Sequence, residues 1–382
     1  MRRLFRFLKK ALLVLVAVIA VGAGIGAVVI SHDGACGPTP AATAGKPSMK
    51  AIVYTCYGAP NEVMRLADVD KPVPADEQVL VRVRAAALNP LDWHYLHGVP
   101  YLMRASAGIG TPENPRLGVD YAGVVEAVGA RVTRFKPGDE VFGGRNGAFA
   151  EYLVVREDKN IVPKPASVAF EEAAAVPVAA ITALQALRDK GKVQAGQKVL
   201  VHGASGGVGT YAVQIAKVLG AEVTAVCSTR NIELVQSLGA DHVIDYTKED
   251  VTQGDVRYDL IVDMVSTHGL LEMKKIMTPE GRLIIVGGAG GPEGRWLGPM
   301  STVLAAMVLQ PFVHQEMKFI LAELNPQDLQ YLAGLMESGR MRSTIDKRYP
   351  LAQAPDALAY LETGRARGKV VITMDEANVA KY

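Results

Sequence analysis

One segment constrains the fold of this chain more than any other, residues 199–228, VLVHGASGGVGTYAVQIAKVLGAEVTAVCS. It predicts a short buried strand, a glycine turn, a helix with one apolar face and a second strand at 223–226. Glycine at such a turn lets a pyrophosphate approach the unpaired N–H groups of the helix N-terminus. We interpret the segment as a dinucleotide-binding βαβ unit; the alternative is a glycine turn that binds nothing. The expected loop contacts are Ala204, Ser205, Gly206, Gly207, Val208 and Gly209.

The residues after the second strand decide which dinucleotide such a unit prefers. A site for NAD places Asp or Glu about 20 residues beyond the last glycine, on the ribose hydroxyls. Here the sequence at 227–231 is CSTRN, without a carboxylate. The hydroxyl of Ser228 and the guanidinium of Arg230 favour the 2′-phosphate of NADPH. The alternative for Arg230 is a solvated cap residue.

The N-terminus has the pattern of a membrane anchor. Five of the first ten residues are Lys or Arg, and residues 11–30 carry no charge. At 1.5 Å per residue a helix of that length is about 30 Å long, which matches the hydrocarbon core of a bilayer. A cleaved export signal has a shorter apolar region. We therefore predict an uncleaved single-pass anchor within residues 1–30, in a membrane of the bacterial inner type, with a cleaved signal as the alternative.

Two arguments disagree on which side of the membrane the rest of the chain lies. The basic residues before the span place the N-terminus in the cytoplasm and the body outside. Free NADPH, in contrast, is expected in the cytoplasm. Either the charge bias is overridden, or the body works outside with a cofactor bound before export. The sequence leaves both open.

Composition narrows the partners and the covalent chemistry. The net charge is +2 and the basic residues beyond the first ten are scattered, which argues against a nucleic-acid partner. The cysteines are Cys36, Cys56 and Cys227, an odd number without a CxxC pair, so we expect neither a disulfide framework nor a zinc cluster. Residues 31–48, rich in Gly, Pro and Ala, predict a flexible linker.

Hydrophobic patterning divides the body into two domains. Short alternating β runs with glycine turns occupy 49–175 and predict an irregular β-rich domain. Strands that alternate with helices occupy 176–312 and predict a parallel sheet. The pattern beyond 313 ends in a strand at 369–373, so 313–382 are predicted to return to the first domain. The apolar segment 296–313 is too short for a second span, and we interpret it as a helix at the substrate pocket or at a subunit contact.

Five motifs in order resemble the medium-chain dehydrogenase/reductase superfamily and, within it, the zinc-free quinone oxidoreductases, which include the mitochondrial reticulon-interacting oxidoreductases. The motifs are ALNPLD at 87–92, LGVDYAGVV at 117–125, FKPGDEV at 135–141, the glycine loop, and RGKVV at 367–371. The resemblance covers residues 49–374. It implies an α/β fold in which a GroES-like β-rich catalytic domain is joined to a Rossmann cofactor domain with a doubly wound parallel sheet, and it suggests a homodimer.

The resemblance also bears on metal binding. Zinc-dependent members of the superfamily hold a metal with a Cys in the first motif, a His-Glu pair in the second, and a third ligand near the helical linker. This chain has Asn89, Val119-Asp120 and about Pro177 at those places, which implies no metal. Without a Lewis acid, conjugated acceptors are favoured, because the charge of an enolate or a hydroquinone anion is delocalised.

Three residues of the first domain receive expected roles. Asn89 resembles the active-site Asn of the family and is the first candidate for a hydrogen-bond donor to the product oxygen; the alternative is an Asn that only forms a turn. Tyr101 is a second candidate donor, with the alternative of a Tyr that merely lines the pocket. Asp92 is expected to fix its loop through backbone N–H groups.

The cofactor contacts implied by the resemblance extend beyond the glycine loop. They are Thr182 near the nicotinamide, Tyr246 near the 2′-phosphate, and Arg365 and Arg367 in the last turn before Gly368, the alternative for the two arginines being solvated loop charges. The expected activity is NADPH-dependent hydride transfer to a lipophilic quinone or an α,β-unsaturated carbonyl. A non-catalytic NADPH-binding module and an alcohol dehydrogenase or enoyl reductase are the alternatives.

Overall fold

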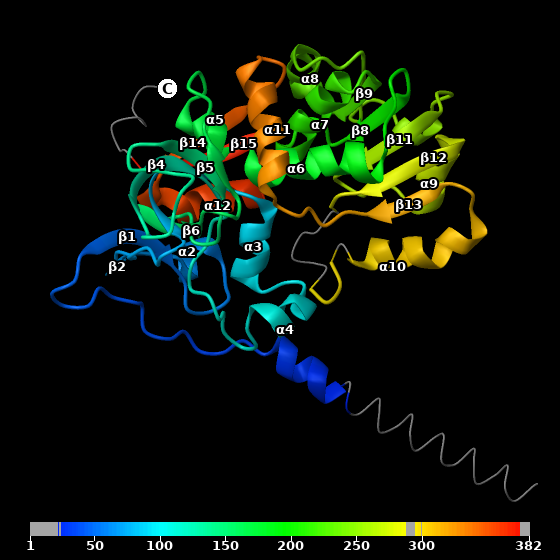
Figure 1. Cartoon of the computed structure of the whole chain (residues 1–382). Coiled ribbons are helices and arrows are strands. Elements are labelled where there is room, and N and C mark those ends of the chain that lie inside the picture. The colour runs from blue at the N-terminus through cyan, green and yellow to red at the C-terminus, as the bar shows by residue number, and fades with distance from the viewer. Residues whose placement is uncertain (1–21, 23, 288–294, 299, 375–382) are drawn as a thin grey trace, which may run out of the picture.

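A computed structural model of the chain describes residues 22, 24–287, 295–298 and 300–374. These residues form a six-stranded sheet, a seven-stranded sheet and a separate two-stranded hairpin, with helices packed around them (Figure 1). Helix α6 (Pro177–Leu184) packs against α7 (Gly207–Val218) of one half and against strands of the other half. The two halves therefore meet along α6.

The six-stranded sheet is parallel throughout, in the order β10-β9-β8-β11-β12-β13. Its strands are β8 (Lys198–His202), β9 (Glu222–Cys227), β10 (His242–Asp245), β11 (Tyr258–Asp263), β12 (Met277–Ile285) and β13 (Glu316–Phe319). This is the order of a doubly wound sheet, which binds its ligand where the strand order reverses, at the carboxyl ends of β8 and β11. The predicted Rossmann domain is confirmed.

The sheet extends past the predicted domain boundary at residue 312, because β13 pairs with β12. The sequence EMKF alternates charged and apolar residues in an edge strand, so no apolar run marked it. The remaining helices of this half are α8 (Ile232–Ser237), α9 (Leu270–Lys275), α10 (Met300–Leu309) and α11 (Pro326–Glu337). The predicted helix within 296–313 is thus present as α10.

The seven-stranded sheet joins residues from both ends of the body. Its strands are β3 (Gln78–Ala87), β4 (Asp120–Val128), β5 (Glu140–Gly144), β6 (Tyr152–Arg156), β7 (Ile161–Pro163), β14 (Ile345–Pro350) and β15 (Lys369–Thr373). Strand β15 pairs antiparallel with β3, Ile372 opposite Ala86. The segment from β14 onward thus contributes strands to the sheet of the β-rich domain. The hairpin is formed by β1 (Ser48–Val53) and β2 (Arg65–Asp70).

Short helices complete the β-rich domain and surround the site described below. They are α2 (Pro60–Val63), α3 (Pro90–His97), α4 (Arg104–Ala107), α5 (Phe170–Ala174) and α12 (Ala354–Glu362). Helix α3 begins after Asn89, with Pro90 in its first turn, and ends at Gly98, whose φ of 58° is a left-handed conformation suited to glycine.

The prediction of a flexible linker is wrong, and the chain has one disulfide although no disulfide framework was expected. Cys36 and Cys56 form a disulfide, and Thr43 and Lys46 bond the carboxylate of Asp70 at 2.6 Å and 3.2 Å. Cysteine parity excluded a framework of several bridges but not one bridge with one cysteine left over, and Cys227 is the buried third cysteine. We call residues 30–47 the strap, because they are fastened along the surface of the body.

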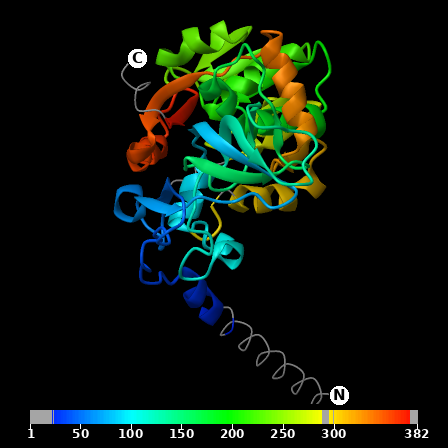
Figure 2. The same ribbon diagram turned by 60° about the vertical axis from the view of Figure 1, so that its left-hand side comes forward.

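The predicted anchor, residues 11–30, falls mainly on residues 1–21, outside the described part of the chain. Within the described residues, no helix is both long enough and apolar enough to cross a membrane. The described remainder of this segment is helical at 24–31 and lies next to α4, as both views show (Figures 1 and 2).

Candidate active site

The three segments that carry the metal ligands in zinc-dependent relatives converge on the carboxylate of Asp120. The Asn89 side-chain amide donates to Asp120 Oδ2 at 2.9 Å, and the Val178 backbone N–H at the start of α6 donates to Oδ1 at 3.0 Å. The ammonium of Lys369, on the returning strand β15, donates to Asn89 Oδ1 at 2.6 Å and lies 3.3 Å from Asp120 Oδ2. We call Asn89, Asp120 and Lys369 the buried triad.

Every donor of the Lys369 ammonium has an acceptor, since the Leu88 carbonyl accepts its third bond at 2.9 Å. Both charged groups are buried. Burial raises the pKa of Asp120 and lowers the pKa of Lys369, and in each case the opposite charge of the partner counteracts the shift. A buried ion pair costs desolvation energy and is tolerated when its polar atoms are all satisfied, as they are here.

A zinc ion does not fit this arrangement. The first-motif position holds an amide, the second holds a valine beside Asp120, and Asp120 is already paired with an ammonium group. Zinc sites in proteins use thiolate, imidazole and carboxylate ligands. The Lys369 ammonium, 3.3 Å from Asp120 Oδ2, would repel a metal ion bound to that carboxylate. Within the described ranges, no group of three or more His, Cys, Asp or Glu residues is arranged to hold a metal ion.

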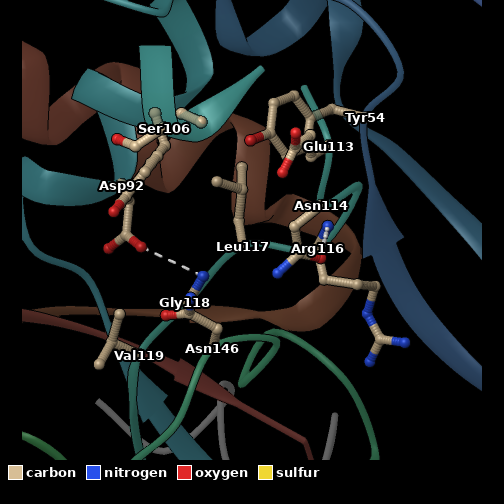
Figure 3. Close-up of a pocket in the computed structure, with 12 residues that line it drawn as sticks. Tyr54, Asp92, Ser106, Glu113, Asn114, Arg116, Leu117, Gly118, Val119 and Asn146 are labelled. Carbon is tan, nitrogen blue, oxygen red and sulfur yellow. Dashed lines mark hydrogen bonds between the residues drawn. The ribbon is translucent and has the colours of Figure 1, made fainter. Parts of the chain in front are cut away.

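A pocket is lined in part by residues of α3 and α4, and its lining includes Asp92, which bonds the backbone of Asn89 (Figure 3). Its volume is about 140 Å³, comparable to a cavity that accepts a single benzene ring. Val119, at the position of the metal-binding His of zinc-dependent relatives, forms part of its wall. The full lining is Tyr54, Asp92, Tyr95, Ser106, Ala107, Glu113, Asn114, Arg116, Leu117, Gly118, Val119 and Asn146.

Asp92 makes the backbone contacts predicted for it. Its carboxylate accepts the N–H groups of Asn89 at 2.7 Å and Gly118 at 3.1 Å, which ties the start of α3 to the loop before β4. Complete burial raises the pKa of Asp92 to about 7. The carboxyl therefore joins the pocket wall to Asn89 of the buried triad.

Two phenols of the pocket were missed by sequence reasoning. Tyr54 follows β1 and points its hydroxyl toward the other lining side chains (Figure 3), and Tyr95 lies on α3. Burial raises the pKa of Tyr54, so the phenol remains protonated and able to donate. Neither residue belongs to one of the five motifs, and a lone Tyr after a strand carries no distinguishing signal.

The structure places Tyr101 away from this lining. Its ring packs edge-to-face against Trp296, with centroids 5.1 Å apart, and the guanidinium of Arg104 lies 4.7 Å from its centroid. Asn89 contributes to the buried triad rather than to the pocket lining. Neither catalytic candidate lines this pocket: Asn89 belongs to the buried triad, and Tyr101 packs against Trp296 and Arg104.

The glycine loop forms a cradle at the N-terminus of α7. A Cβ on Gly209 would lie 2.2 Å from the Gly203 carbonyl, so glycine is required where the helix crosses the strand. The Gly368 N–H donates to the Ser205 carbonyl at 2.9 Å, which joins this loop to the turn before Lys369. The cradle and the buried triad are thus connected through two consecutive residues, Gly368 and Lys369.

Most of the remaining predicted cofactor residues gather at the carboxyl ends of β9 and β10. Asn231 donates its amide to the hydroxyls of Ser205 at 2.9 Å and Ser228 at 3.2 Å. The guanidinium of Arg230 donates to the Arg365 carbonyl at 2.8 Å, which brings two exposed arginines together. Tyr246 is held beside them by the bond from its N–H to the Cys227 carbonyl, and Arg367 is exposed on the same turn as Arg365.

One orphaned atom tests whether a nucleotide fits here. The Asn231 side-chain oxygen is buried and has no hydrogen-bond partner within the described part of the chain, although it adjoins two serine hydroxyls. A ribose hydroxyl would satisfy it, and the nearby guanidinium groups suit a phosphate. Asn231 was not predicted from the sequence. Thr182 lies on α6, one turn after the residue whose N–H binds Asp120, with its hydroxyl bonded to the Val178 carbonyl at 2.7 Å.

Comparison with known proteins agrees with this geometry. The family model for an alcohol dehydrogenase GroES-like domain matches residues 75–166, and the model for a zinc-binding dehydrogenase matches 238–372. The chain is 34% identical over 341 residues to a chloroplast envelope quinone oxidoreductase homolog of Arabidopsis thaliana, a match that covers 85% of this chain and 98% of that protein.

Two further similarities concern a second Arabidopsis protein and a solved structure. A chloroplastic NADPH-dependent alkenal/one oxidoreductase of Arabidopsis thaliana is 34% identical over 339 residues, covering 85% of this chain and 79% of that protein. The quinone oxidoreductase of Coxiella burnetii superposes with a TM-score of 0.74 at 29% identity, over 86% of this chain and all of that one. The chain therefore belongs to the quinone oxidoreductase family of the medium-chain dehydrogenase/reductase superfamily.

Proposed function

We propose that this protein is an NADPH-dependent, zinc-independent oxidoreductase that reduces quinones or α,β-unsaturated carbonyls. The observation that carries the proposal is the buried triad, in which an amide, a carboxylate and an ammonium group stand where zinc-dependent relatives hold a metal. The names of the Arabidopsis relatives, a quinone oxidoreductase homolog and an NADPH-dependent alkenal/one oxidoreductase, support the substrate class and the cofactor.

The cofactor would be held at two places. The loop from Ala204 to Gly209 would accept the pyrophosphate at the N-terminus of α7. Ser228, Arg230 and Arg365 would hold the phosphorylated ribose, and Asn231 would receive a ribose hydroxyl. Tyr246, Arg367 and Thr182 remain predicted contacts. Bound NADPH supplies a hydride.

The residues of the chain then have to stabilise the oxygen on which negative charge develops. Asp120 accepts one amide proton of Asn89, which leaves the second amide proton to donate to an oxygen that reaches the buried triad, since Asn89 does not line the pocket itself. Lys369 fixes the orientation of this amide through its 2.6 Å bond to Oδ1. The protonated phenol of Tyr54 is a second donor on the pocket side.

The triad explains why a conjugated acceptor is favoured over a saturated ketone. Neutral donors such as an amide and a phenol stabilise a delocalised enolate or hydroquinone anion more readily than the localised charge of an alkoxide. An alcohol dehydrogenase would need a Lewis acid at this position, where the chain has the triad. Enoyl reduction uses the same hydride and donor arrangement and remains within the proposed chemistry.

The test is NADPH oxidation by the purified full chain in detergent, against a 1,4-quinone, an enone and a saturated ketone. We expect turnover with the quinone or the enone, and little with the ketone. Tight NADPH binding without turnover on any of the three would support a non-catalytic nucleotide-binding module instead. Preferred turnover of the saturated ketone would contradict the proposed substrate class.

We also propose that residues 11–30 anchor the protein in a membrane, with the body on the side opposite the basic N-terminus. The Cys36–Cys56 disulfide supports this side, because disulfides persist mainly in oxidising compartments. NADPH would then be bound before export. Maleimide labelling of unreduced cells, before and after a thiol reductant, tests the side: a body in the cytoplasm would carry Cys36 and Cys56 as free thiols. The predicted homodimer stays a prediction.

A further inference from the structure

The end of the uncharged N-terminal segment is clamped to α4. The guanidinium of Arg104 is only 1% exposed and donates to the carbonyls of Ile30 and His32, at 3.2 Å each. It also pairs with the carboxylate of Asp33 at 2.7 Å. A buried arginine that binds three residues within one four-residue segment fixes both the position and the direction of that segment.

The strap is fastened a second time, to Gly110 and to the residues that follow Tyr54. The Gly34 N–H donates to the Gly110 carbonyl at 2.7 Å, the Cys36–Cys56 disulfide follows, and the Thr55 hydroxyl donates to the Gly37 carbonyl at 3.0 Å. One fastening point adjoins Ser106 on α4, and the other adjoins Tyr54. Both of these residues line the pocket, so the strap is attached to two of its walls.

This fastening removes the freedom that a linker would give. A flexible linker of 18 residues has an end-to-end distance of about 23 Å, which would let the body tumble away from a membrane. Here Ile30, the last residue of the uncharged segment, is bonded directly to α4. Whatever holds residues 11–30 therefore also holds α4 and the pocket wall close to it.

Apolar side chains are exposed around this clamp. Leu102 and Ile109, on either side of α4, are 60% and 54% exposed. Trp296 is 49% exposed and contacts Tyr101, next to Leu102. We call Leu102, Ile109 and Trp296 the apolar rim. Leu102 and Ile109 flank α4 in the sequence, and the N-terminal helix leaves the body next to α4 (Figures 1 and 2).

We propose that the apolar rim rests on the lipid bilayer that holds residues 11–30, so that a lipophilic quinone passes from the membrane into the pocket without crossing water. The occupant is the bilayer rather than a second copy of the chain, because the rim is continuous with the clamped end of a 20-residue uncharged segment preceded by five basic residues. This inference rests on the proposed anchor and on the proposed acceptor class.

The first test is direct and does not depend on activity. The chain has two tryptophans, Trp93 and Trp296, so Trp93→Phe leaves Trp296 as the reporter. The full chain is reconstituted in phosphatidylethanolamine and phosphatidylglycerol vesicles with brominated acyl chains. We expect quenching of Trp296 fluorescence relative to unbrominated vesicles. If the protein floats with the vesicles but Trp296 is not quenched, the rim does not touch lipid and this inference is overturned. The same holds if cross-linking shows that a second copy of the chain covers the rim. If the protein does not float with the vesicles, the proposed anchor itself is overturned.

The second test compares two acceptors with the same ring. In the vesicles, Leu102→Glu with Ile109→Glu should lower turnover of a long-chain isoprenoid quinone about tenfold, because charged side chains resist contact with lipid. Turnover of a water-soluble short-chain quinone should be unchanged. Leu271→Glu is the matched control, since Leu271 is also 60% exposed but lies on α9 of the other domain. An equal loss of turnover with both quinones, or no loss with either, would overturn the proposal. If the wild type turns over neither quinone, the proposed acceptor class is refuted instead. The fluorescence quenching then decides whether the rim contacts lipid.

Discussion

The cofactor cradle and the buried triad lie side by side, yet they are specified in different ways. The cradle is built from one continuous stretch, and its strand, glycine turn and helix follow each other within 30 residues. The triad combines residues up to 280 positions apart, on the first motif, on β4 and on the last strand. The glycine loop of the cofactor site can therefore be predicted from one local sequence pattern, whereas the catalytic centre depends on tertiary contacts between distant motifs.

Removing the ammonium group of Lys369 should give the largest effect, and it tests whether the buried triad depends on contacts between distant motifs. Lys369→Met leaves the carboxylate of Asp120 buried without its cation, which should cost about 3–5 kcal/mol of unfolding free energy. Urea denaturation measures the loss. Lys217→Met is the control, because the Lys217–Asp241 pair is about one-third exposed and should contribute about 1 kcal/mol or less. Similar losses in the two variants would show that the triad is not a special site.

The disulfide of the strap gives the next largest effect. Cys36→Ser should lower the unfolding free energy by about 3 kcal/mol, since the bridge closes a loop of 20 residues. Dithiothreitol should bring the wild-type protein to the stability of the variant and leave the variant unchanged. If the variant and the oxidised wild type unfold at the same urea concentration, the strap is not held by this bridge.

Cofactor choice tests the predicted half of the site. Arg230→Ala should weaken NADPH binding about tenfold or more and leave NADH binding unchanged, because only NADPH carries the 2′-phosphate. Fluorescence titration of both nucleotides measures the ratio. Arg257→Ala is the control. Arg257 is an exposed arginine directly before β11, at the amino ends of the strands, whereas Arg230 lies at their carboxyl ends. A loss of affinity for both nucleotides would assign Arg230 a general rather than a discriminating role.

The pocket carboxyl gives an effect of a different kind, a slope of the unfolding free energy against pH. Because burial raises the pKa of folded Asp92 to about 7, above its unfolded value, the folded state binds more protons between roughly pH 4 and 7. The stability contributed by Asp92 therefore falls as the pH rises through this window, on the order of 1 kcal/mol per pH unit. Asp92→Asn should remove that slope from the stability curve of the variant, so the difference in unfolding free energy between variant and wild type should change steadily with pH. Parallel stability curves between pH 4.5 and 7 would contradict it.

Local patterns predicted the parallel sheet of the cofactor domain, the glycine loop and the last strand at 369–373. They also predicted the tie between Asp92 and its loop, because each of these features follows from short-range periodicity or from one motif. Lys369 stands inside the RGKVV motif at 367–371, but nothing local shows that its ammonium reaches Asn89. Asn231 and Tyr54 are similar cases, since their roles depend on partners contributed by other elements.

The strap and the edge of the cofactor sheet show a different reason for failure. Residues rich in Gly and Pro are typical of a linker, and only the distant positions of Cys56, Asp70 and Arg104 make them an ordered segment. Strand β13 was missed because its four residues lack an apolar run. In both cases the tertiary partner, and not the local sequence, determines the structure.

The most direct test of the central claim is turnover after metal removal. The full chain, treated with a strong chelator and assayed for residual zinc, is given NADPH and a 1,4-quinone, with a saturated ketone in parallel. We expect the metal-free protein to reduce the quinone at an unchanged rate and to reduce little of the ketone, because the buried triad stands in the place of the metal. Loss of quinone reduction on chelation, with recovery on adding zinc, would contradict it.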